Sequence, residues 1–120
     1  MIHWKDYTGY YRCTSDTIFT CDTETSSYWI LPDGRITGYK EEFTNEEYNN
    51  MPCGAVVYIW MIGIDDDVIY GRELRELPEC IRMIREHVSD DIIIYVHNLA
   101  YDFQFFRNVF DFTDVFARTQ

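Results

Sequence analysis

The sequence predicts an α/β fold in which helices pack on a mixed sheet. Apolar runs at Thr17–Thr23, Gly54–Ile64 and Ile92–Val96 have the length and composition of strands. Two other segments, Leu77–Val88 and the residues after Asn98, carry apolar side chains at helical spacing. The elements therefore follow the order β, insert, β, β, α, β, α. Early strands followed by alternating strands and helices are typical of a mixed sheet with flanking helices.

Composition limits the classes of protein to which this chain can belong. Its 120 residues, 47% hydrophobic and 18% aromatic, are enough for one domain with a core and argue against disorder. No apolar run approaches the roughly 20 residues of a membrane span, and Met1–Lys5 lacks the apolar core of a signal peptide. We therefore expect a cytoplasmic protein with no membrane partner. A net charge of −11 argues against nucleic-acid binding mainly through a basic surface, although carboxylates attract cations.

The first part of the chain divides into three segments. Residues 1–16 show no periodicity and are expected to form an N-terminal lead-in to a domain that spans 17–120. Thr17–Thr23 is rich in β-branched and aromatic residues and lacks glycine and proline, so it is expected to be a central strand. Residues 26–53 form a variable insert, in which Pro32-Asp33-Gly34-Arg35 predicts a hairpin turn. Thr44-Asn45-Glu46-Glu47 fits a capping box and predicts a short helix.

The second part contains the remaining strands and helices. Gly54–Ile64 and Ile92–Val96 are continuous apolar runs, and we expect both to be buried strands, the latter parallel to the first strand. Asp65–Asp67 is expected to turn the chain into a third, more exposed strand at Val68–Arg72. Leu77–Val88 predicts a helix whose first turn accommodates Pro78. The four cysteines form no C-x-x-C pair, which argues against a zinc site and against a disulfide framework.

Two short acidic motifs eighty residues apart carry the chemistry. Asp22 and Glu24 lie near the end of the first strand, where residues two apart point to one face. Asp102 follows the strand at Ile92–Val96 and would be the third carboxylate. Adjacent carboxylates repel, and Mg²⁺ or Mn²⁺ compensates such a pair because both ions prefer oxygen ligands. The motifs therefore predict a divalent-metal site of the kind that cleaves phosphodiester bonds through two ions.

Each residue also has a simpler interpretation. Asp22 and Glu24 are acidic residues that could face solvent at a strand end, and Asp102 is suited to the first turn of a helix. His97 is better explained as a structural histidine than as a metal ligand. The stripe Phe103, Phe105, Phe106 and Phe110 is expected to be mostly core. Either motif alone is a weak signal, and their joint placement after two predicted strands makes the metal site the stronger hypothesis.

The motifs also carry a resemblance to a known family. Phe19-Thr20-Cys21-Asp22-Thr23-Glu24-Thr25 resembles the first exonuclease motif of family B DNA polymerases. His97-Asn98-Leu99-Ala100-Tyr101-Asp102 resembles the second, in the form found in the protein-primed polymerases of bacteriophages and viruses. The resemblance covers roughly residues 17–118 and implies a ribonuclease H-like fold of the DEDD exonuclease superfamily, truncated at its C-terminus.

This resemblance implies a role for each motif residue. Asp22, Glu24 and Asp102 would be the catalytic metal ligands of a 3′→5′ proofreading site that uses Mg²⁺ or Mn²⁺. Thr25, Asn98 and Tyr101 would contact the 3′ end of single-stranded DNA. The other implied partners are the remainder of a polymerase chain and a terminal protein primer.

The chain lacks parts that the family possesses. None of its ten tyrosines has an aspartate four residues later, so the third exonuclease motif, Tyr-x-x-x-Asp, is absent. The polymerase motifs Asp-x-x-Ser-Leu-Tyr-Pro and Asp-Thr-Asp are absent too. We expect the N-terminal piece of a DNA-directed DNA polymerase that by itself hydrolyses DNA weakly or not at all. The alternatives are a catalytically incomplete module that binds single-stranded DNA or protein, a DEDD nuclease unrelated to polymerases, and an acidic domain without a site.

Overall fold

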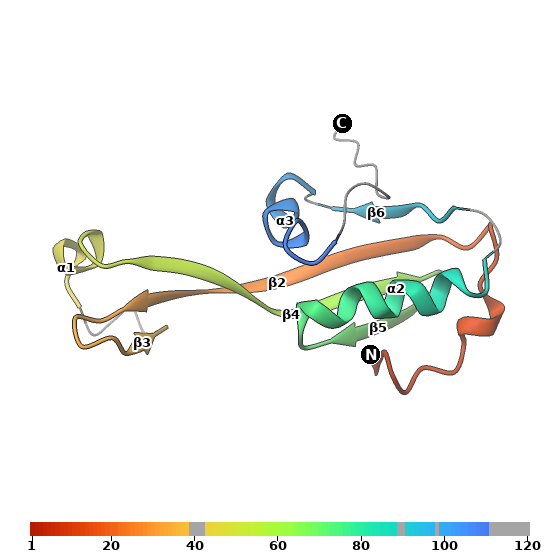
Figure 1. Cartoon of the computed structure of the whole chain (residues 1–120), viewed down its shortest axis with the longest axis horizontal. Coiled ribbons are helices and arrows are strands. Elements are labelled where there is room, and N and C mark those ends of the chain that lie inside the picture. The colour runs from red at the N-terminus through yellow and green to blue at the C-terminus, as the bar shows by residue number, and fades with distance from the viewer. Residues whose placement is uncertain (39–42, 89–90, 98, 111–120) are drawn as a thin grey trace.

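The computed structural model describes residues 1–38, 43–88, 91–97 and 99–110, and Figure 1 shows its architecture. The chain forms a six-stranded mixed sheet with helices packed on it, as the sequence predicts. In chain order the elements are β1 (Ile2–His3), the 3₁₀ helix η1 (Tyr10–Arg12), β2 (Phe19–Ile30), β3 (Ile36–Thr37), α1 (Asn45–Asn49), β4 (Cys53–Ile64), β5 (Asp67–Gly71), the 3₁₀ helix η3 (Leu74–Glu76), α2 (Leu77–Arg85), β6 (Ile94–Val96) and α3 (Leu99–Phe106).

Strand β2 is the centre of the sheet. Its antiparallel partner is β4, which in turn pairs antiparallel with β5. On its other side β2 pairs in parallel with β6, so the predicted parallel pairing of the two motif strands is confirmed. The register places Phe19 beside Ile94 and Cys21 beside Val96. The first acidic motif therefore continues along β2 beyond the point where β6 ends and the second motif begins.

The core lies on one face of the sheet. Every second residue at the start of β2 is buried, as the two-residue period of a strand requires, and Phe19 and Cys21 point into the core. Trp60 and Ile62 of β4 are fully buried on the same face, packed in one cluster with side chains from α2 and with Phe106 of α3. Helix α2 buries Leu77, Cys80 and Ile84, so the predicted amphipathic helix is confirmed.

The opposite face of the sheet is largely open, which corrects the expectation that two strands would be covered on both sides. Val56 and Tyr58 of β4 are 51% and 44% exposed, and Tyr95 of β6 is 62% exposed. Continuous apolar runs predict coverage on both faces only when helices pack on both. Within the described ranges, α2 and α3 contribute their buried side chains to a single cluster, so the apolar side chains of the other face stay at the surface.

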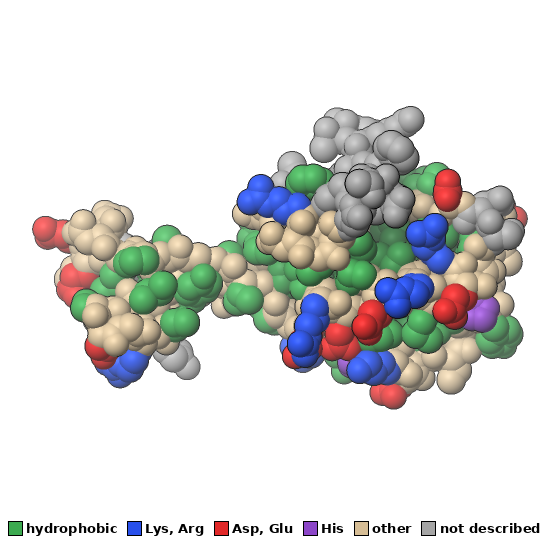
Figure 2. All heavy atoms as spheres, viewed as in Figure 1, with side chains coloured by type: hydrophobic (Ala, Val, Ile, Leu, Met, Phe, Trp, Pro, Cys, Tyr) green, Lys and Arg blue, Asp and Glu red, His purple; other side chains and the backbone are tan. Residues whose placement is uncertain are grey.

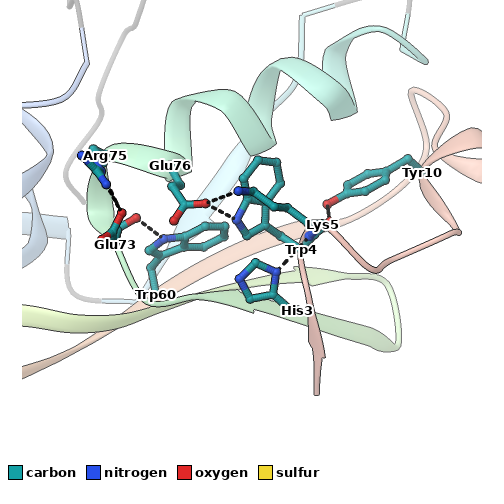
Figure 3. A network of polar contacts seen from close by, with 8 residues as sticks. All are labelled: His3, Trp4, Lys5, Tyr10, Trp60, Glu73, Arg75 and Glu76. Carbon is teal, nitrogen blue, oxygen red and sulfur yellow. Dashed lines mark hydrogen bonds and ion pairs between the residues drawn. The ribbon is translucent and has the colours of Figure 1, made fainter.

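Residues 1–16, expected to be a lead-in, contribute to the core. Strand β1 pairs in parallel with β5, and Trp4, Tyr7 and Tyr10 are buried. Figure 3 shows the polar contacts that fix this segment: the indole Nε1 of Trp4 donates to Oε2 of Glu76 at 3.0 Å, and the hydroxyl of Tyr10 donates to the carbonyl of Trp4 at 2.6 Å. The buried residues of this segment are large aromatic residues in turns and a 3₁₀ helix. Their spacing in the sequence therefore has neither a strand period nor a helix period.

The insert at 26–53 forms much of an arm that projects from the body of the molecule (Figure 1). We define the arm as the β2–β4 ribbon beyond Glu24 and Tyr58 together with β3 and α1. The Pro32–Arg35 turn joins β2 to β3 with Gly34 at φ 88°, which confirms the predicted hairpin. The capping box is confirmed too, because Thr44 Oγ1 accepts from the backbone N–H of Glu47 at 3.2 Å. The principal extents of 54 × 29 × 21 Å reflect this elongated shape.

All four cysteines are free thiols. Cys21 and Cys80 are buried, and burial raises the pKa of the Cys80 thiol to about 11. Across the described ranges, no helix reaches the length and apolarity that a membrane crossing requires.

Candidate active site

Strand β2 places two carboxylates on the open face of the sheet. Asp22 and Glu24 alternate with Thr23 along the strand and are both exposed. Asp22 Oδ1 accepts a hydrogen bond of 2.9 Å from the backbone N–H of Thr23. The prediction that the two carboxylates share a face is confirmed by this alternation. Immediately after Glu24 the register with β4 shifts, because Glu24 pairs with Ile59 and Thr25 pairs with Val57.

This register shift is a β-bulge in which Tyr58 has no partner on β2. A bulge bends its strand and redirects the side chains beside it, and bulges are frequent next to functional sites. Here the bulge lies opposite Glu24 and Thr25, at the position where the arm, as defined above, begins. The orientation of these two candidate residues therefore depends on an irregularity in the neighbouring strand.

Asp102 lies in the first turn of α3, on the helix-covered face of β2. Its side chain is the one buried charged group among the described residues, with 3% of its surface exposed. Thr23 Oγ1 donates a hydrogen bond of 2.8 Å to Asp102 Oδ1. Burial raises the pKa of the Asp102 carboxyl, the hydrogen bond from Thr23 opposes this shift, and the nearby charge of Asp22 adds to it. The charge of Asp22 therefore acts on Asp102, although the Asp22 side chain lies on the open face of β2 and Asp102 lies on the covered face.

A second contact joins the two motifs one step further along β2. The hydroxyls of Thr25 and Tyr101 are 2.9 Å apart and hydrogen-bonded. Together with the Thr23–Asp102 bond, this contact attaches the first turn of α3 to alternate positions of the strand. Thr25 and Tyr101, which the resemblance assigns to DNA contact, are therefore adjacent, and Tyr101 is 40% exposed. Asn98, the third residue of that assignment, lies outside the described residues.

The structure brings Asp22, Thr23, Asp102, Thr25 and Tyr101 into one region from motifs eighty residues apart. It does not gather the three carboxylates into one ligand set. Among the described residues, no group of three or more histidine, cysteine, aspartate or glutamate side chains is placed to hold a metal ion. Asp22 and Glu24 fit Mg²⁺ or Mn²⁺ by the chemistry of their oxygen donors and by their exposure. Asp102 does not join them, because its carboxylate is directed toward Thr23.

The sequence motifs do not identify two features of this region. The first is Thr23, which lies between the two predicted ligands and to which the sequence analysis gave no role. Strand alternation directs its side chain to the face opposite Asp22 and Glu24, where a helix packs. The second is a depression of about 490 Å³ beside Asp22 on the open face. Its lining residues come from β2, β4, β5 and β6 and from the residue that follows β6: Thr20, Cys21, Asp22, Met61, Gly63, Val68, Tyr95, Val96 and His97.

Comparison of the chain with protein-family models, with curated proteins and with solved structures finds no match in any of the three. The functional conclusion therefore depends on the motifs and on the way the fold brings them together.

Proposed function

We propose that this chain is the N-terminal 3′→5′ proofreading part of a DNA-directed DNA polymerase of the family B, protein-primed type. The observation that carries the proposal is the juxtaposition of the two acidic motifs. The first motif runs along the central strand β2, the second begins where the parallel strand β6 ends, and Thr23 of one bonds Asp102 of the other at 2.8 Å.

The sheet supports a ribonuclease H-like fold. Its strand order β5-β4-β2-β6 combines two antiparallel pairs with one parallel pair, and α2 connects β5 to β6. The candidate residues lie on the central strand and on the helix that follows its parallel neighbour. Ligand sites of mixed α/β sheets are commonly found beyond the carboxyl ends of such parallel strands.

Each candidate residue has a role in this proposal. Asp22 and Glu24 hold Mg²⁺ or Mn²⁺, and such ions supply an activated water and stabilise the leaving oxygen of a phosphodiester. Asp102 contributes a third carboxylate when substrate and the remaining parts of the site are present. Tyr101 stacks on a terminal base, and Thr25 and Asn98 bond phosphate or sugar, so that DNA is held regardless of its sequence.

The isolated chain is expected to hydrolyse DNA weakly or not at all. Two-metal sites of this kind need three or four carboxylates, and the chain lacks the Tyr-x-x-x-Asp motif that supplies the fourth. The carboxylate of Asp102 also accepts a hydrogen bond from Thr23. Its partners in this proposal are the 3′ end of single-stranded DNA, the remainder of the polymerase chain and a terminal protein primer.

Two experiments test the proposal. The coding DNA beyond the Gln120 codon is expected to continue into Tyr-x-x-x-Asp and then into the polymerase motifs. A stop codon there, with no neighbouring reading frame that encodes these motifs, would overturn the polymerase assignment. Titration of the chain with Mn²⁺, followed by electron paramagnetic resonance, is expected to show binding that Asp22→Asn and Glu24→Gln each weaken. Glu46→Gln, which alters an exposed acidic residue on the arm, is the matched control.

A second candidate function is a module that binds single-stranded DNA without cutting it. The hydrogen bond that Asp102 accepts from Thr23, and the lack of a three-carboxylate group among the described residues, favour this alternative. DNA binding that survives Asp22→Asn together with Glu24→Gln, and fails with Tyr101→Ala, would support the binding module. Binding of RNA in preference to DNA would instead indicate a DEDD nuclease unrelated to polymerases.

A further inference from the structure

Asp102 depends on Thr23 for its hydrogen bonding. The Asp102 side chain is 3% exposed in the first turn of α3, and Thr23 Oγ1 donates to its Oδ1 at 2.8 Å. Among the described residues, this is the one hydrogen bond that the carboxyl group of Asp102 accepts. Thr23 comes from β2, between Asp22 and Glu24. The third predicted metal ligand is therefore attached to the strand that carries the other two.

The two carboxyl oxygens of Asp102 differ in their surroundings. Oδ1 is held by Thr23, whereas Oδ2 accepts no hydrogen bond from the residues that the structure describes. Within the same described ranges, no buried side-chain oxygen lacks a hydrogen-bond partner. Oδ2 must therefore reach the surface, because it would otherwise be a buried oxygen without a partner. Oδ2 is thus the oxygen that a divalent cation can meet, and carboxylate oxygens are the ligands that Mg²⁺ and Mn²⁺ prefer.

The charged side chains that act on Asp102 come from the depression on the open face. Burial is the main cause of the raised pKa of the Asp102 carboxyl; of the charged side chains, Asp22 adds to this shift and His97 opposes it. The acidic side chains along α2, by contrast, lie among basic ones (Figure 2), so they attract a cation less strongly. A divalent cation near both Asp22 and Asp102 would relieve the repulsion between their carboxylates.

Thr23 brings a hydroxyl to a face of β2 that otherwise packs apolar side chains. The residues that precede it on this face, Phe19 and Cys21, are both buried in the core. Valine has nearly the shape of threonine, so packing alone does not explain the hydroxyl. The two heavy atoms on the Cβ of threonine restrict χ1, which fixes the direction in which the hydroxyl points. The Thr23 hydroxyl therefore restricts the orientation of the Asp102 carboxyl group.

The first turn of α3 is held on β2 at a second point. The hydroxyls of Thr25 and Tyr101 are hydrogen-bonded at 2.9 Å. Because Tyr101 and Asp102 are adjacent in α3, the backbone that carries Asp102 is attached to β2 independently of Thr23. Loss of the Thr23 hydroxyl is therefore expected to free the carboxyl group of Asp102 more than it displaces the helix.

We propose that Thr23 is a positioning residue for Asp102. By holding Oδ1, its hydroxyl leaves Oδ2 as the oxygen that binds Mg²⁺ or Mn²⁺, and Thr23 itself does not touch the ion. The inference rests on the metal site proposed above, to which Asp102 contributes the third carboxylate. Carboxylate ligands bind a metal more tightly when hydrogen bonds fix their orientation beforehand, and loss of such a bond typically costs about 10–100-fold in affinity.

Titration of the chain with Mn²⁺ in the presence of a single-stranded oligodeoxynucleotide, followed by electron paramagnetic resonance, tests the proposal. Thr23→Val is expected to weaken Mn²⁺ binding by roughly tenfold, and Thr23→Ser, which keeps the hydroxyl, is expected to retain most of the affinity. Tyr7→Phe is the matched control, because the Tyr7 hydroxyl donates to Asp67 Oδ2 at the same distance of 2.8 Å. Equal weakening by Thr23→Val and Tyr7→Phe, or no weakening by Thr23→Val, would overturn the proposal.

The Asp102→Asn background separates positioning from general destabilisation. Asp102→Asn is expected to weaken Mn²⁺ binding, and Thr23→Val is expected to have no further effect in this background, because Thr23 acts through Asp102. A further tenfold loss there would contradict the positioning role. Binding that Asp22→Asn weakens and Thr23→Val does not would overturn this inference alone. Binding that neither substitution changes would overturn the proposed metal site as well.

A measurement on the wild-type chain supplies a second readout that no loss of folding can obscure. Nuclear magnetic resonance follows the carboxyl carbons while Mg²⁺ is added in the presence of the same oligonucleotide. The Asp102 resonance is expected to shift together with those of Asp22 and Glu24, because a bound cation polarises the carboxyl group that it meets. The carboxyl carbon of Asp67 is the internal control and is expected to stay unchanged. Shifts at Asp22 and Glu24 with none at Asp102 would refute the role of Oδ2 and with it the proposal.

Discussion

Thr23 Oγ1 donates a hydrogen bond of 2.8 Å to Asp102 Oδ1 and so connects residues 79 positions apart in the sequence. Thr23 stands between the two exposed carboxylates of β2, and Asp102 is buried beneath the first turn of α3. A buried carboxylate without a hydrogen-bond donor is costly, so this contact fixes both the helix and the orientation of the carboxylate. Four predictions follow from this site and from the packing around it.

Thr23→Val removes the hydroxyl with little change in side-chain volume. The Asp102 carboxylate then loses its donor inside the protein, and the free energy of unfolding is expected to fall by about 1–3 kcal/mol. Urea unfolding at neutral pH measures this loss. Thr23→Ser retains the hydroxyl and is the matched control, expected to lose markedly less stability. Equal losses in the two variants would show that the methyl group of Thr23 matters and the hydrogen bond does not.

The raised pKa of Asp102 gives a pH dependence of defined sign. Because burial raises its pKa in the folded state above the ordinary value of about 3.9, the folded protein binds more protons than the unfolded chain between these two values. The contribution of Asp102 to stability is therefore greatest below the ordinary value and is lost as pH rises through the folded-state pKa.

The isosteric variant Asp102→Asn isolates this contribution, since the amide oxygen still accepts from Thr23. Relative to Asp102→Asn, the wild-type protein is expected to lose stability as pH rises from about 4 toward neutrality. Urea unfolding of both proteins across this range provides the comparison. A difference that stays constant with pH, or that changes in the opposite direction, would refute the assignment of a raised pKa.

Gly71→Ala is expected to disrupt packing at the junction of β5 and β4. A Cβ at Gly71 would lie 2.2 Å from Cζ2 of Trp60, whose side chain is fully buried and cannot move aside. Trp60 Nε1 also donates to the carbonyl of Glu73 at 2.8 Å, which holds the ring in place. The free energy of unfolding is expected to fall by about 1–3 kcal/mol or more, as measured by urea unfolding.

Gly38→Ala serves as the control for this substitution. A Cβ at Gly38 would meet its nearest neighbour, the carbonyl oxygen of Ser27, at an ordinary contact distance of 3.7 Å. Its effect on the free energy of unfolding is therefore expected to be small. A Gly71→Ala protein as stable as Gly38→Ala would mean that the sheet relaxes around Trp60.

Tyr101 offers a test of the proposed DNA contact. If its ring stacks on a base, Tyr101→Ala lowers the affinity for single-stranded DNA by the equivalent of about 1–3 kcal/mol. Tyr101→Phe keeps the ring, loses the bond to Thr25 and is expected to retain most of the affinity. Fluorescence anisotropy with a labelled oligonucleotide measures both. Tyr11→Ala, at an exposed site in η1, is the control, and equal losses for Tyr11→Ala and Tyr101→Ala would argue against a specific contact.

Local patterns predicted much of the fold. The β-branched run at Thr17–Thr23, the alternation through Asp22 and Glu24, the amphipathic helix α2 and the Pro32–Arg35 turn all depend on interactions between residues close in sequence. Such patterns span only a few neighbouring residues, so their signatures can be recognised in the sequence. The parallel pairing of β6 with β2 follows from the alternation of direction along the chain: β4 and β5 pair in antiparallel fashion with their predecessors, and α2 then returns the chain to the free side of β2.

Other features had no local signature. The aromatic residues Trp4, Tyr7 and Tyr10 belong to the core through turns that have no period. The coverage of β4 and β6 was misjudged, because an apolar run reports a preference for burial and not the number of helices that are present to bury it. The role of Thr23 depends on a residue 79 positions away, which no window of sequence contains.

The sequence by itself indicated most of the strands and helices, and it placed Asp22 and Glu24 on one face of a strand that Asp102 would approach. It did not show that this strand continues to Ile30, so the expectation that Asp22 and Glu24 lie near the strand end is wrong: both lie inside β2, because β4 pairs with β2 along its whole length. The tertiary structure alone decided on which side of β2 each carboxylate lies. Strand alternation directs Asp22 and Glu24 to the open face, whereas α3 packs on the covered face and brings Asp102 to Thr23. The physical reason is that backbone periodicity is a local property, while the face that a helix covers is decided by packing across the whole sheet.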